Sequence, residues 1–351
     1  MAAAWVVVYH LWGQAPNHPM QHWYQVWRDG GYLGVSVFFV LSGFILAYNA
    51  QEIVDKGRFY ALRFARVYPL YLAALLWALP NYLRHGMKGQ TGVGSWVALP
   101  ASLLLLQGWF GPSVATQINA PGWSLSHEAF FYVMFPFALP LVKRWMHRWR
   151  WMLAGLTVLA ILPSSTVHVW MAVHGQAAPG WWQDWFMALP LCWLSTFLIG
   201  AVLGRLFRER MPRVSGTQML LACTVSMLCV LVHGHLPFDL VRAGLLALPF
   251  GWLIYSLAGW ESKLLRSRPL QLAGEISYGV YLLQIPLYMT VNQLGLNQGG
   301  MRLLECVLLL PVAYVFYRMV EKPGRRMLLR GLGVRSMENV PERIAEPVRV
   351  S

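Results

Sequence analysis

Charged side chains are scarce in this chain. They make up 12% of its 351 residues, whereas an average soluble domain carries about 25%. Hydrophobic residues make up 57%, and this balance excludes an ordinary soluble globular protein. Apolar stretches of roughly the length needed to cross a bilayer recur along the whole sequence. We expect spans at residues 33–50, 67–83, 125–142, 151–173, 186–204, 217–236, 239–258, 275–294 and 302–319, with a shorter one at the start.

Long linkers and low-complexity segments are also missing between these stretches, which indicates one continuous domain. The sequence therefore predicts an all-α fold: a polytopic membrane helix bundle of about ten transmembrane helices plus one re-entrant or interfacial segment. We expect this integral membrane domain to occupy residues 1–330 and a cytoplasmic tail to follow at residues 331–351.

Acidic residues are few: 14 Asp and Glu face 28 Lys and Arg, for a formal net charge of +14. Such an excess can attract nucleic acid. The distribution of this charge argues against nucleic acid. Lys and Arg gather in every second loop, and in a membrane protein such loops are typical of the cytoplasmic side. Both termini should then be cytoplasmic. The basic loops are residues 51–66, 143–150, 205–213, 261–268 and the segment from Arg318 onward.

The apolar piece at residues 95–107 is expected not to cross the bilayer. If the loops at 51–66 and 143–150 are both cytoplasmic, an even number of crossings must separate them. The spans at 67–83 and 125–142 already supply two. We therefore interpret 95–107 as the re-entrant or interfacial segment.

The chain has only four cysteines, and all of them fall within predicted spans. They show neither the spacing of metal ligands nor a pattern of extracellular pairing. We expect small apolar packing residues, with no metal site. They are Cys192, Cys223, Cys229 and Cys306.

The first apolar stretch is too short for a simple crossing. Residues 1–12 precede Gly13 and reach about 18 Å as a helix, against a hydrocarbon core of about 30 Å. The loop charges nevertheless require a crossing there. We favour a chain whose first helical turns lie upstream of Met1. The alternative is a short, tilted helix that thins the bilayer locally.

His10 ends this first apolar stretch. A histidine in a span is costly when charged and titrates near neutral pH, so it suits general-base work on a hydroxyl group. The alternative is an interfacial histidine that is hydrogen-bonded near the outer headgroups.

Arg63 and Arg66 are three residues apart at the predicted cytoplasmic end of a span, so they share a helix face. Arginine side chains match phosphate oxygens with two parallel hydrogen bonds. An anionic ligand is one interpretation. Ordinary anchoring by lipid phosphates is the other.

Glu128 follows Trp123-Ser124-Leu125-Ser126-His127 at the start of a predicted helix. One interpretation is structural: Ser124 or Ser126 caps the helix, and the acid in its first turn suits the helix dipole. The other is functional, with a carboxylate in the bundle interior that orients His10 or a sugar hydroxyl. His127 and Glu128 lack the second histidine of a zinc-binding H-E-x-x-H motif.

Six short motifs follow one another along the sequence. They are Val7-Val8-Tyr9-His10, Phe38-Phe39-Val40-Leu41-Ser42-Gly43-Phe44, Arg63-Phe64-Ala65-Arg66 with Tyr68-Pro69, Trp123-Ser124-Leu125-Ser126-His127-Glu128 through Tyr132, Ile276-Ser277-Tyr278-Gly279-Val280-Tyr281-Leu282, and Glu321-Lys322-Pro323. In this order they resemble the acyltransferase-3 family of integral membrane acyltransferases, which includes O-acetyltransferases of bacterial surface polysaccharides.

The resemblance implies a reaction. An acyl group, with acetyl expected, would pass from cytoplasmic acyl-CoA to a hydroxyl of a cell-surface or exported glycan or a lipid-linked sugar. It also implies residence in the lipid bilayer of the bacterial inner membrane, with acetyl-CoA as co-substrate and no permanently bound cofactor.

The same resemblance assigns roles to residues. His10 matches the family's essential histidine, Arg63 and Arg66 match its proposed coenzyme A contact, and Glu128 would orient or polarise a reacting group. We expect further substrate contacts from Ser42, Trp123, Ser124 and Tyr278. The chain departs from the family in two places. An arginine usual eleven residues before the histidine would fall before Met1, and Gln284 stands where many members have a histidine.

Two other classes of protein remain open at this point. A secondary transporter or exporter of a small anionic or sugar-like compound also fits many spans with scattered polar groups. Paired halves with broken helices, which many transporters show, are not recognisable in the sequence. Dependence on acyl-CoA would separate the enzyme from a transporter. An inactive relative that serves as an assembly partner is the third possibility.

Overall fold

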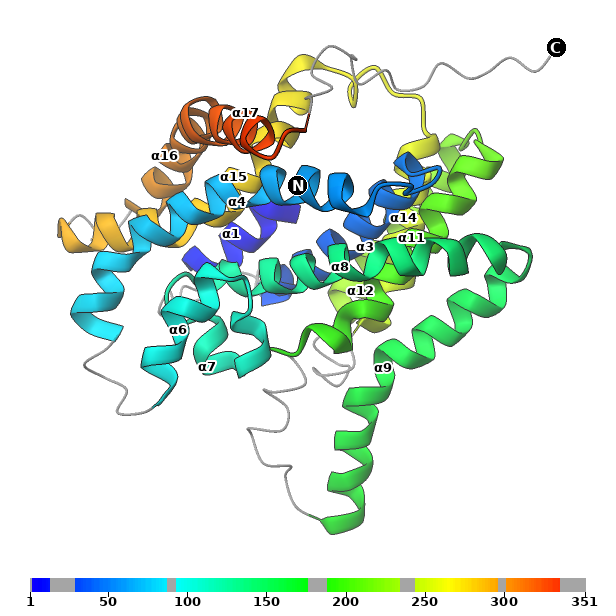
Figure 1. Ribbon diagram of the computed structural model, residues 1–351. Coiled ribbons are helices and arrows are strands. Elements are labelled where there is room, and N and C mark those ends of the chain that lie inside the picture. The colour runs from blue at the N-terminus through cyan, green and yellow to red at the C-terminus, as the bar shows by residue number, and fades with distance from the viewer. Residues whose placement is uncertain are drawn as a thin grey trace.

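The computed structural model describes residues 2–12, 29–86, 93–175, 188–233, 244–295 and 301–334, and most of these residues are helical, with no strand among them. Figure 1 shows the helices packed as a bundle. The longer helices are α1 (Ala2–Trp12), α3 (Leu33–Asn49), α4 (Lys56–Asn81), α6 (Val93–Leu103), α8 (Trp123–Arg144), α9 (Trp149–His174), α11 (Leu194–Arg210), α12 (Gly216–Val232), α14 (Ala247–Gly259), α15 (Arg268–Gln293), α16 (Met301–Phe316) and α17 (Lys322–Gly331).

Short helical turns connect these elements, and most of them lie at the ends of the long helices. They are η1 (Gly30–Tyr32), η2 (Tyr82–Gly86), η3 (Gln107–Phe110), α7 (Pro112–Ala115), η4 (Ala120–Gly122), η5 (Met146–Arg148), η6 (Pro190–Trp193) and η9 (Tyr317–Glu321).

Four helical segments of the described chain are long and apolar enough to cross a membrane. They are Gly30–Asn49, Lys56–Arg84, Ala120–Arg144 and Pro190–Arg210. Shorter apolar helices occur at Ala2–Leu11, Gly216–Val232 and Ala247–Gly259. The all-helical membrane class is therefore confirmed, and the count of about ten spans stays a prediction.

The relative directions of the helices agree with the predicted topology. Tyr278 of α15 bonds to Val67 of α4, and Gln293 bonds to Asn81, so the chain advances in the same direction along both helices. The predicted spans at 67–83 and 275–294 are the third and the ninth, and both should run outward. The parallel arrangement is the one that the loop charges require.

Helices α3 and α11 are in direct backbone contact, because glycines stand where they meet. A Cβ atom on Gly43 of α3 would overlap the carbonyl oxygen of Phe197 in α11. One on Gly200 or Gly204 would overlap the carbonyl oxygen of Val40 or of Phe44. The Gly200-x-x-x-Gly204 spacing is a familiar contact motif between membrane helices. This contact fixes α3, which carries Ser42.

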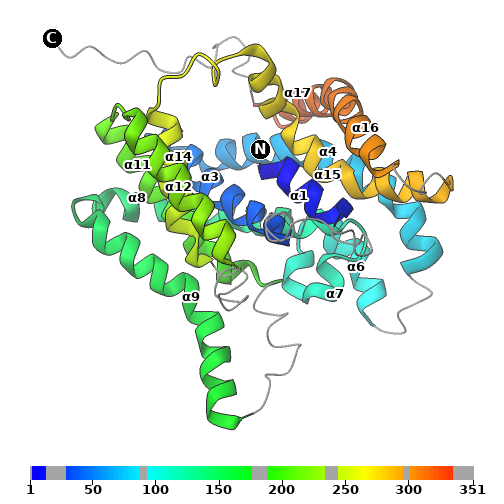
Figure 2. The same ribbon diagram turned by 180° about the vertical axis from the view of Figure 1, so that it is seen from behind.

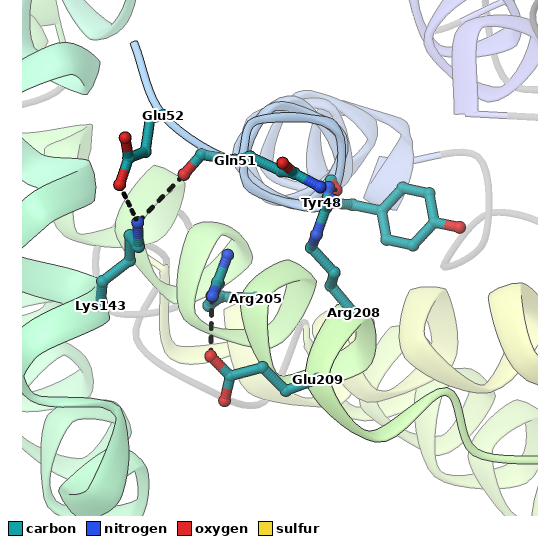
Figure 3. A network of polar contacts seen from close by, with 7 residues as sticks. All are labelled: Tyr48, Gln51, Glu52, Lys143, Arg205, Arg208 and Glu209. Carbon is teal, nitrogen blue, oxygen red and sulfur yellow. Dashed lines mark hydrogen bonds and ion pairs between the residues drawn. The ribbon is translucent and has the colours of Figure 1, made fainter. Parts of the chain in front are cut away.

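Polar side chains join the ends of α3, α8 and α11 (Figure 3). Lys143 Nζ donates to Gln51 O at 3.1 Å and lies 3.4 Å from Glu52 Oε1. Arg208 Nη1 donates to Tyr48 O at 2.5 Å, so a cation lies at the carboxyl end of α3, where the helix dipole favours it. This end of the bundle is the one predicted to face the cytoplasm.

The segment predicted to be re-entrant, residues 95–107, overlaps α6, which covers 11 residues and is followed by the short turns η3, α7 and η4. Hydrogen bonds tie it to α4: the hydroxyl of Tyr71 donates to Ser102 O at 2.7 Å, and that of Tyr68 donates to Leu103 O at 3.1 Å. These bonds occupy the carbonyl groups at the end of α6. A broken helix bound to its neighbour agrees with a segment that does not cross.

Helix α9 covers the whole span predicted at 151–173, but its second half extends away from the other helices in both views (Figures 1 and 2). The cysteines are free thiols, and Cys223 is exposed on α12, so the prediction of a packing role is wrong for that residue.

Most of the predicted tail, residues 335–351, lies outside the described residues.

Candidate active site

Helices α3, α4, α8 and α15 line an open cavity of about 260 Å³. The residues predicted from the sequence that line this cavity are Ser42, Arg63, Arg66, Ser124, Glu128 and Tyr278. They come from four separate motifs, and the fold brings them to one place. His10 and Trp123 are not part of its wall.

Glu128 is the acidic group of this cavity. Helix α8 begins at Trp123 and has no acidic residue in its first turn and no side-chain cap, so the helix-capping interpretation of Glu128, Ser124 and Ser126 is wrong. Glu128 Oε1 accepts hydrogen bonds from Tyr132, one turn further along α8, and from Ser42 Oγ at 3.3 Å. Two hydroxyl groups from two helices therefore fix the carboxylate.

The two arginines of the cavity have different partners. Arg66 forms an ion pair with Glu321, which is 2% exposed, and its Cζ lies 6.0 Å from the ring centroid of Tyr278. Arg63 packs its guanidinium 5.7 Å from the ring of Phe59, and its Nε is buried without a hydrogen-bond partner among the described residues. Arg63 thus has free donor capacity, whereas part of Arg66 is held by the protein.

Ser124 and Tyr281 form a hydroxyl pair on the wall of the cavity. Their oxygens are 2.8 Å apart, and the hydroxyl of Tyr281 donates to Pro121 O at 3.0 Å. Pro121 belongs to the turn η4 that leads into α8, so this pair anchors the start of α8 to α15. It also presents polar atoms to the cavity.

Trp123 lies in an aromatic cluster behind the cavity. Its ring is 4.9 Å from His127 and 6.2 Å from Phe39, both edge to face. His127 is fully buried, bonds through Nδ1 to Trp123 O at 2.9 Å, and stacks on Phe39 at 5.6 Å. We therefore correct the expectation for Trp123: in this structure it supports Phe39, which lines the cavity, rather than lining the cavity itself.

His10 lies on α1, against α15. Its Nδ1 is 3.2 Å from Oε1 of Gln284, and Gln284 Nε2 donates to Tyr281 O at 2.8 Å. The hydrogen-bond partner of His10 among the described residues is therefore Gln284 and not Glu128, which leaves a sugar hydroxyl as the group that Glu128 would orient. Gln284 lies one helical turn from Tyr281, which lines the cavity.

Helix α15 connects the parts of the site. Tyr278, Tyr281 and Gln284 follow at intervals of three residues, which spans about 9 Å along the helix axis. The first lies beside Arg66, the second bonds to Ser124, and the third bonds to His10. The arginines and the histidine thus lie at opposite ends of one line of polar residues.

Among the described residues, no three His, Cys, Asp or Glu side chains gather as they would around a metal ion. The groups that the site itself offers are cations for an anionic ligand, a carboxylate that accepts hydrogen bonds, and an imidazole.

Comparison with known proteins identifies the family. Residues 1–318 match the model of the acyltransferase domain. The chain belongs to the acyltransferase-3 family. It is therefore an acyl-transferring enzyme, and its helices make it a membrane protein. No solved structure gives a significant match.

Three relatives illustrate the range of this family. The acyltransferase MdmB of Streptomyces mycarofaciens is 29% identical over 326 residues, which cover 86% of this chain and 82% of the relative. The exopolysaccharide production protein ExoZ of Rhizobium meliloti is 25% identical over 328 residues, 90% and 95% of the two chains. The peptidoglycan O-acetyltransferase OatA of Listeria monocytogenes is 24% identical over 342 residues, 86% of this chain and 52% of the relative. This chain thus spans about half the length of OatA.

Sequence reasoning did not assign roles to three residues of this acyltransferase that the structure connects to the site. Tyr132 could have been found, because it follows Glu128 by four residues and so shares its helix face. Tyr281 could have been found in the same way, because it follows Tyr278 by three residues and so shares its helix face. Glu321 gave no such signal, because its partner lies near the other end of the chain.

Proposed function

We propose that this acyltransferase moves an acyl group, acetyl first of all, from cytoplasmic acyl-CoA to a hydroxyl of a cell-surface or exported glycan. The observation that carries the proposal is the placement of Arg63, Arg66 and Glu128 around one cavity, with α15 leading from it to His10. The chain would act in the bacterial inner membrane with both termini in the cytoplasm.

Coenzyme A is the donor that suits the cationic end of the cavity. It carries phosphate groups, and guanidinium groups bind phosphate oxygens through charge-assisted, often paired hydrogen bonds. Arg63 has a buried Nε without a partner, and Arg66 is partly exposed, so both have donor capacity left for an anion. A bound anion would also explain why two arginines stand beside a bundle interior where charge is costly.

His10 is the candidate general base. The imidazole would take the proton of the acceptor hydroxyl while the acceptor oxygen bonds to the acyl carbon. The carbon–sulfur bond of the thioester then breaks, and the thiolate of coenzyme A takes up a proton. Glu128, fixed by Ser42 and Tyr132, would orient the reacting groups between the two ends of the cavity.

The acceptor is proposed as a glycan because of the relatives, and a lipid-linked sugar is kept as the alternative that the family resemblance implies. One is named a peptidoglycan O-acetyltransferase and another an exopolysaccharide production protein. Ser42, Ser124 and Tyr278 would supply polar contacts to substrate in the cavity.

The test uses sealed membrane vesicles from a host that expresses the chain, supplied with acetyl-CoA radiolabelled in the acetyl group. We expect label in a glycan or lipid-linked sugar fraction with the wild type, and none with His10→Ala or Arg63→Met. His174→Ala is the matched control, because His174 is exposed at the far end of α9 and should not matter. Full labelling by a folded His10→Ala protein would remove the proposed role of that residue.

Membership of an acyltransferase family disfavours the transporter alternative. The same vesicles decide between the two classes, because a transporter would move label across the membrane without forming an ester. Alkali-labile label on a glycan is the product that an O-acyltransferase leaves.

A further inference from the structure

Gln284 is the one residue that the described structure places in hydrogen-bond contact with His10, and it is only 1% exposed. Both ends of its amide are used. Nε2 lies 2.8 Å from the carbonyl oxygen of Tyr281, and Oε1 lies 3.2 Å from Nδ1 of His10. The side chain is therefore held between the backbone of α15 and the imidazole on α1.

The hydrogen bonds decide which way the amide points. A backbone carbonyl oxygen can only accept a hydrogen bond, so the group facing Tyr281 O must be the NH₂ of Gln284. The amide oxygen must then face His10. An amide oxygen also only accepts, so the imidazole must donate to it, and the proton of the neutral ring must lie on Nδ1.

This assignment has a chemical consequence. In a neutral imidazole with its proton on Nδ1, the lone pair is on Nε2. Within the described residues Nε2 of His10 has no hydrogen-bond partner, so it is available to a ligand. With the amide reversed, Nδ1 would carry the lone pair and face an NH₂ group, and Nε2 would carry the proton and could not accept one.

We propose that Gln284 is a positioning residue for the acyl transfer: it fixes the tautomer and the orientation of His10 so that Nε2 takes the proton of the acceptor hydroxyl. This inference rests on the proposed function, because it concerns the same base. In the step itself the acceptor oxygen forms a bond to the acyl carbon, and the carbon–sulfur bond of the thioester breaks. The thiolate of coenzyme A leaves and afterwards takes up a proton.

Glutamine suits this position for a physical reason. An amide does not ionise, so it keeps its acceptor toward Nδ1 at any pH at which the protein is folded. It also places no charge in a nearly inaccessible site, where an ion would be costly. One N–H of the amide also donates to the backbone of its own helix, which holds the side chain in this orientation.

The experiment measures kcat and KM for acetyl-CoA in the purified full-length protein, for wild type, Gln284→Leu, Gln284→Glu and Thr290→Val. Gln284→Leu removes the acceptor and should lower kcat about 10- to 100-fold, less than the loss of about 10²- to 10⁴-fold expected when a general base itself is removed. Its KM for acetyl-CoA should stay within about 2-fold, because the donor's phosphates are proposed to bind at the arginines. Gln284→Glu, in the neutral form that an inaccessible site favours, keeps an acceptor oxygen toward Nδ1 and an O–H donor toward Tyr281 O, so it should recover kcat to within about 5-fold of wild type.

Thr290→Val is the matched control. Thr290 lies further along α15 and accepts a hydrogen bond from Trp77 Nε1 of α4 at 3.0 Å, so its loss also removes a side-chain bond between helices. It should leave kcat unchanged. If Gln284→Leu does not fold, as judged by size-exclusion chromatography in detergent, Gln284→Met provides the same loss of acceptor with an unbranched side chain.

Four results would overturn the inference: unchanged kcat in the variant that lacks the acceptor, an equal loss of kcat in Thr290→Val, a rise in KM with unchanged kcat, or no recovery in Gln284→Glu. Failure of the proposed function looks different. In that case the wild-type protein itself would transfer no acyl group from any acyl-CoA.

Discussion

The pairing of Arg66 with Glu321 leads to a prediction that separates stability from donor binding. Glu321 is 2% exposed, whereas the side chain of Arg66 is 37% exposed. Replacing Arg66 by Met therefore leaves a carboxylate buried without its cation. Replacing Arg63 by Met breaks no ion pair among the described residues, and Glu128, the buried carboxylate that interacts with Arg63, keeps Arg66 and its two hydroxyl donors. Arg66→Met should thus lower the stability of the protein, whereas Arg63→Met should leave it nearly unchanged.

The magnitude follows from burial. Removing one partner of a fully buried ion pair destabilises a protein by about 3–5 kcal/mol. Because Arg66 is about one-third exposed, solvent screening reduces the value here, and we expect a loss of about 2–3 kcal/mol. Arg63→Met should lose less than about 1 kcal/mol, as most partly exposed substitutions do. Both variants should bind coenzyme A weakly.

The double variant Arg66→Met/Glu321→Gln tests the cause. It removes the unpaired buried charge, so it should regain at least half of the stability lost by Arg66→Met, although it should not regain coenzyme A binding. This non-additivity is the signature of a direct interaction between two residues.

The assay is equilibrium unfolding in mixed micelles, read by tryptophan fluorescence, with coenzyme A binding measured on the same preparations. A loss of stability in Arg66→Met no larger than in Arg63→Met would refute the reasoning. So would a double variant whose loss is the sum of the two single losses.

Three other outcomes are expected. Ser42→Ala removes one of the two hydroxyl groups that hold Glu128, while Tyr132 keeps the carboxylate in place. We expect kcat in the vesicle assay to fall about 10-fold, which corresponds to about 1.4 kcal/mol. Gly200→Ala adds a Cβ against the carbonyl oxygen of Val40, so α3 and α11 must separate, and unfolding in micelles should show a loss of about 1–3 kcal/mol. Lys143→Met breaks an exposed ion pair and should change stability by less than about 1 kcal/mol in the same measurement.

The parts of the site that follow from local sequence were predictable. Arg63 and Arg66 share a helix face because they are three residues apart, and both line the cavity. Ser42 and Glu128 belong to motifs of the resembled family, and the structure joins them by a hydrogen bond. The charge of the loops predicted the relative direction of α4 and α15 because basic residues stay on one side of a membrane.

The parts that depend on contacts between distant segments were not predictable. No spacing in the sequence indicates that Glu321 reaches Arg66, because the two lie on segments that meet only after the bundle has formed. The start of α8 was misjudged for a related reason. Ser124 and Ser126 are good capping residues in isolation, but the hydroxyl of Ser124 bonds to Tyr281 and that of Ser126 accepts from the backbone of Gly108.

The geometry of α15 places limits on how an acyl group could pass between the two ends of the site. Tyr278 lies beside Arg66, and Gln284, which holds His10, follows about 9 Å further along the helix axis. Arg66 and His10 contact residues of α15 that are this far apart, so the two groups are placed to act on different atoms. Under the proposed function they must act on different parts of one extended donor, with phosphates at one end of α15 and the thioester at the other. The polar wall formed by Ser124 and Tyr281 lies between these ends, where the rest of the donor would have to pass.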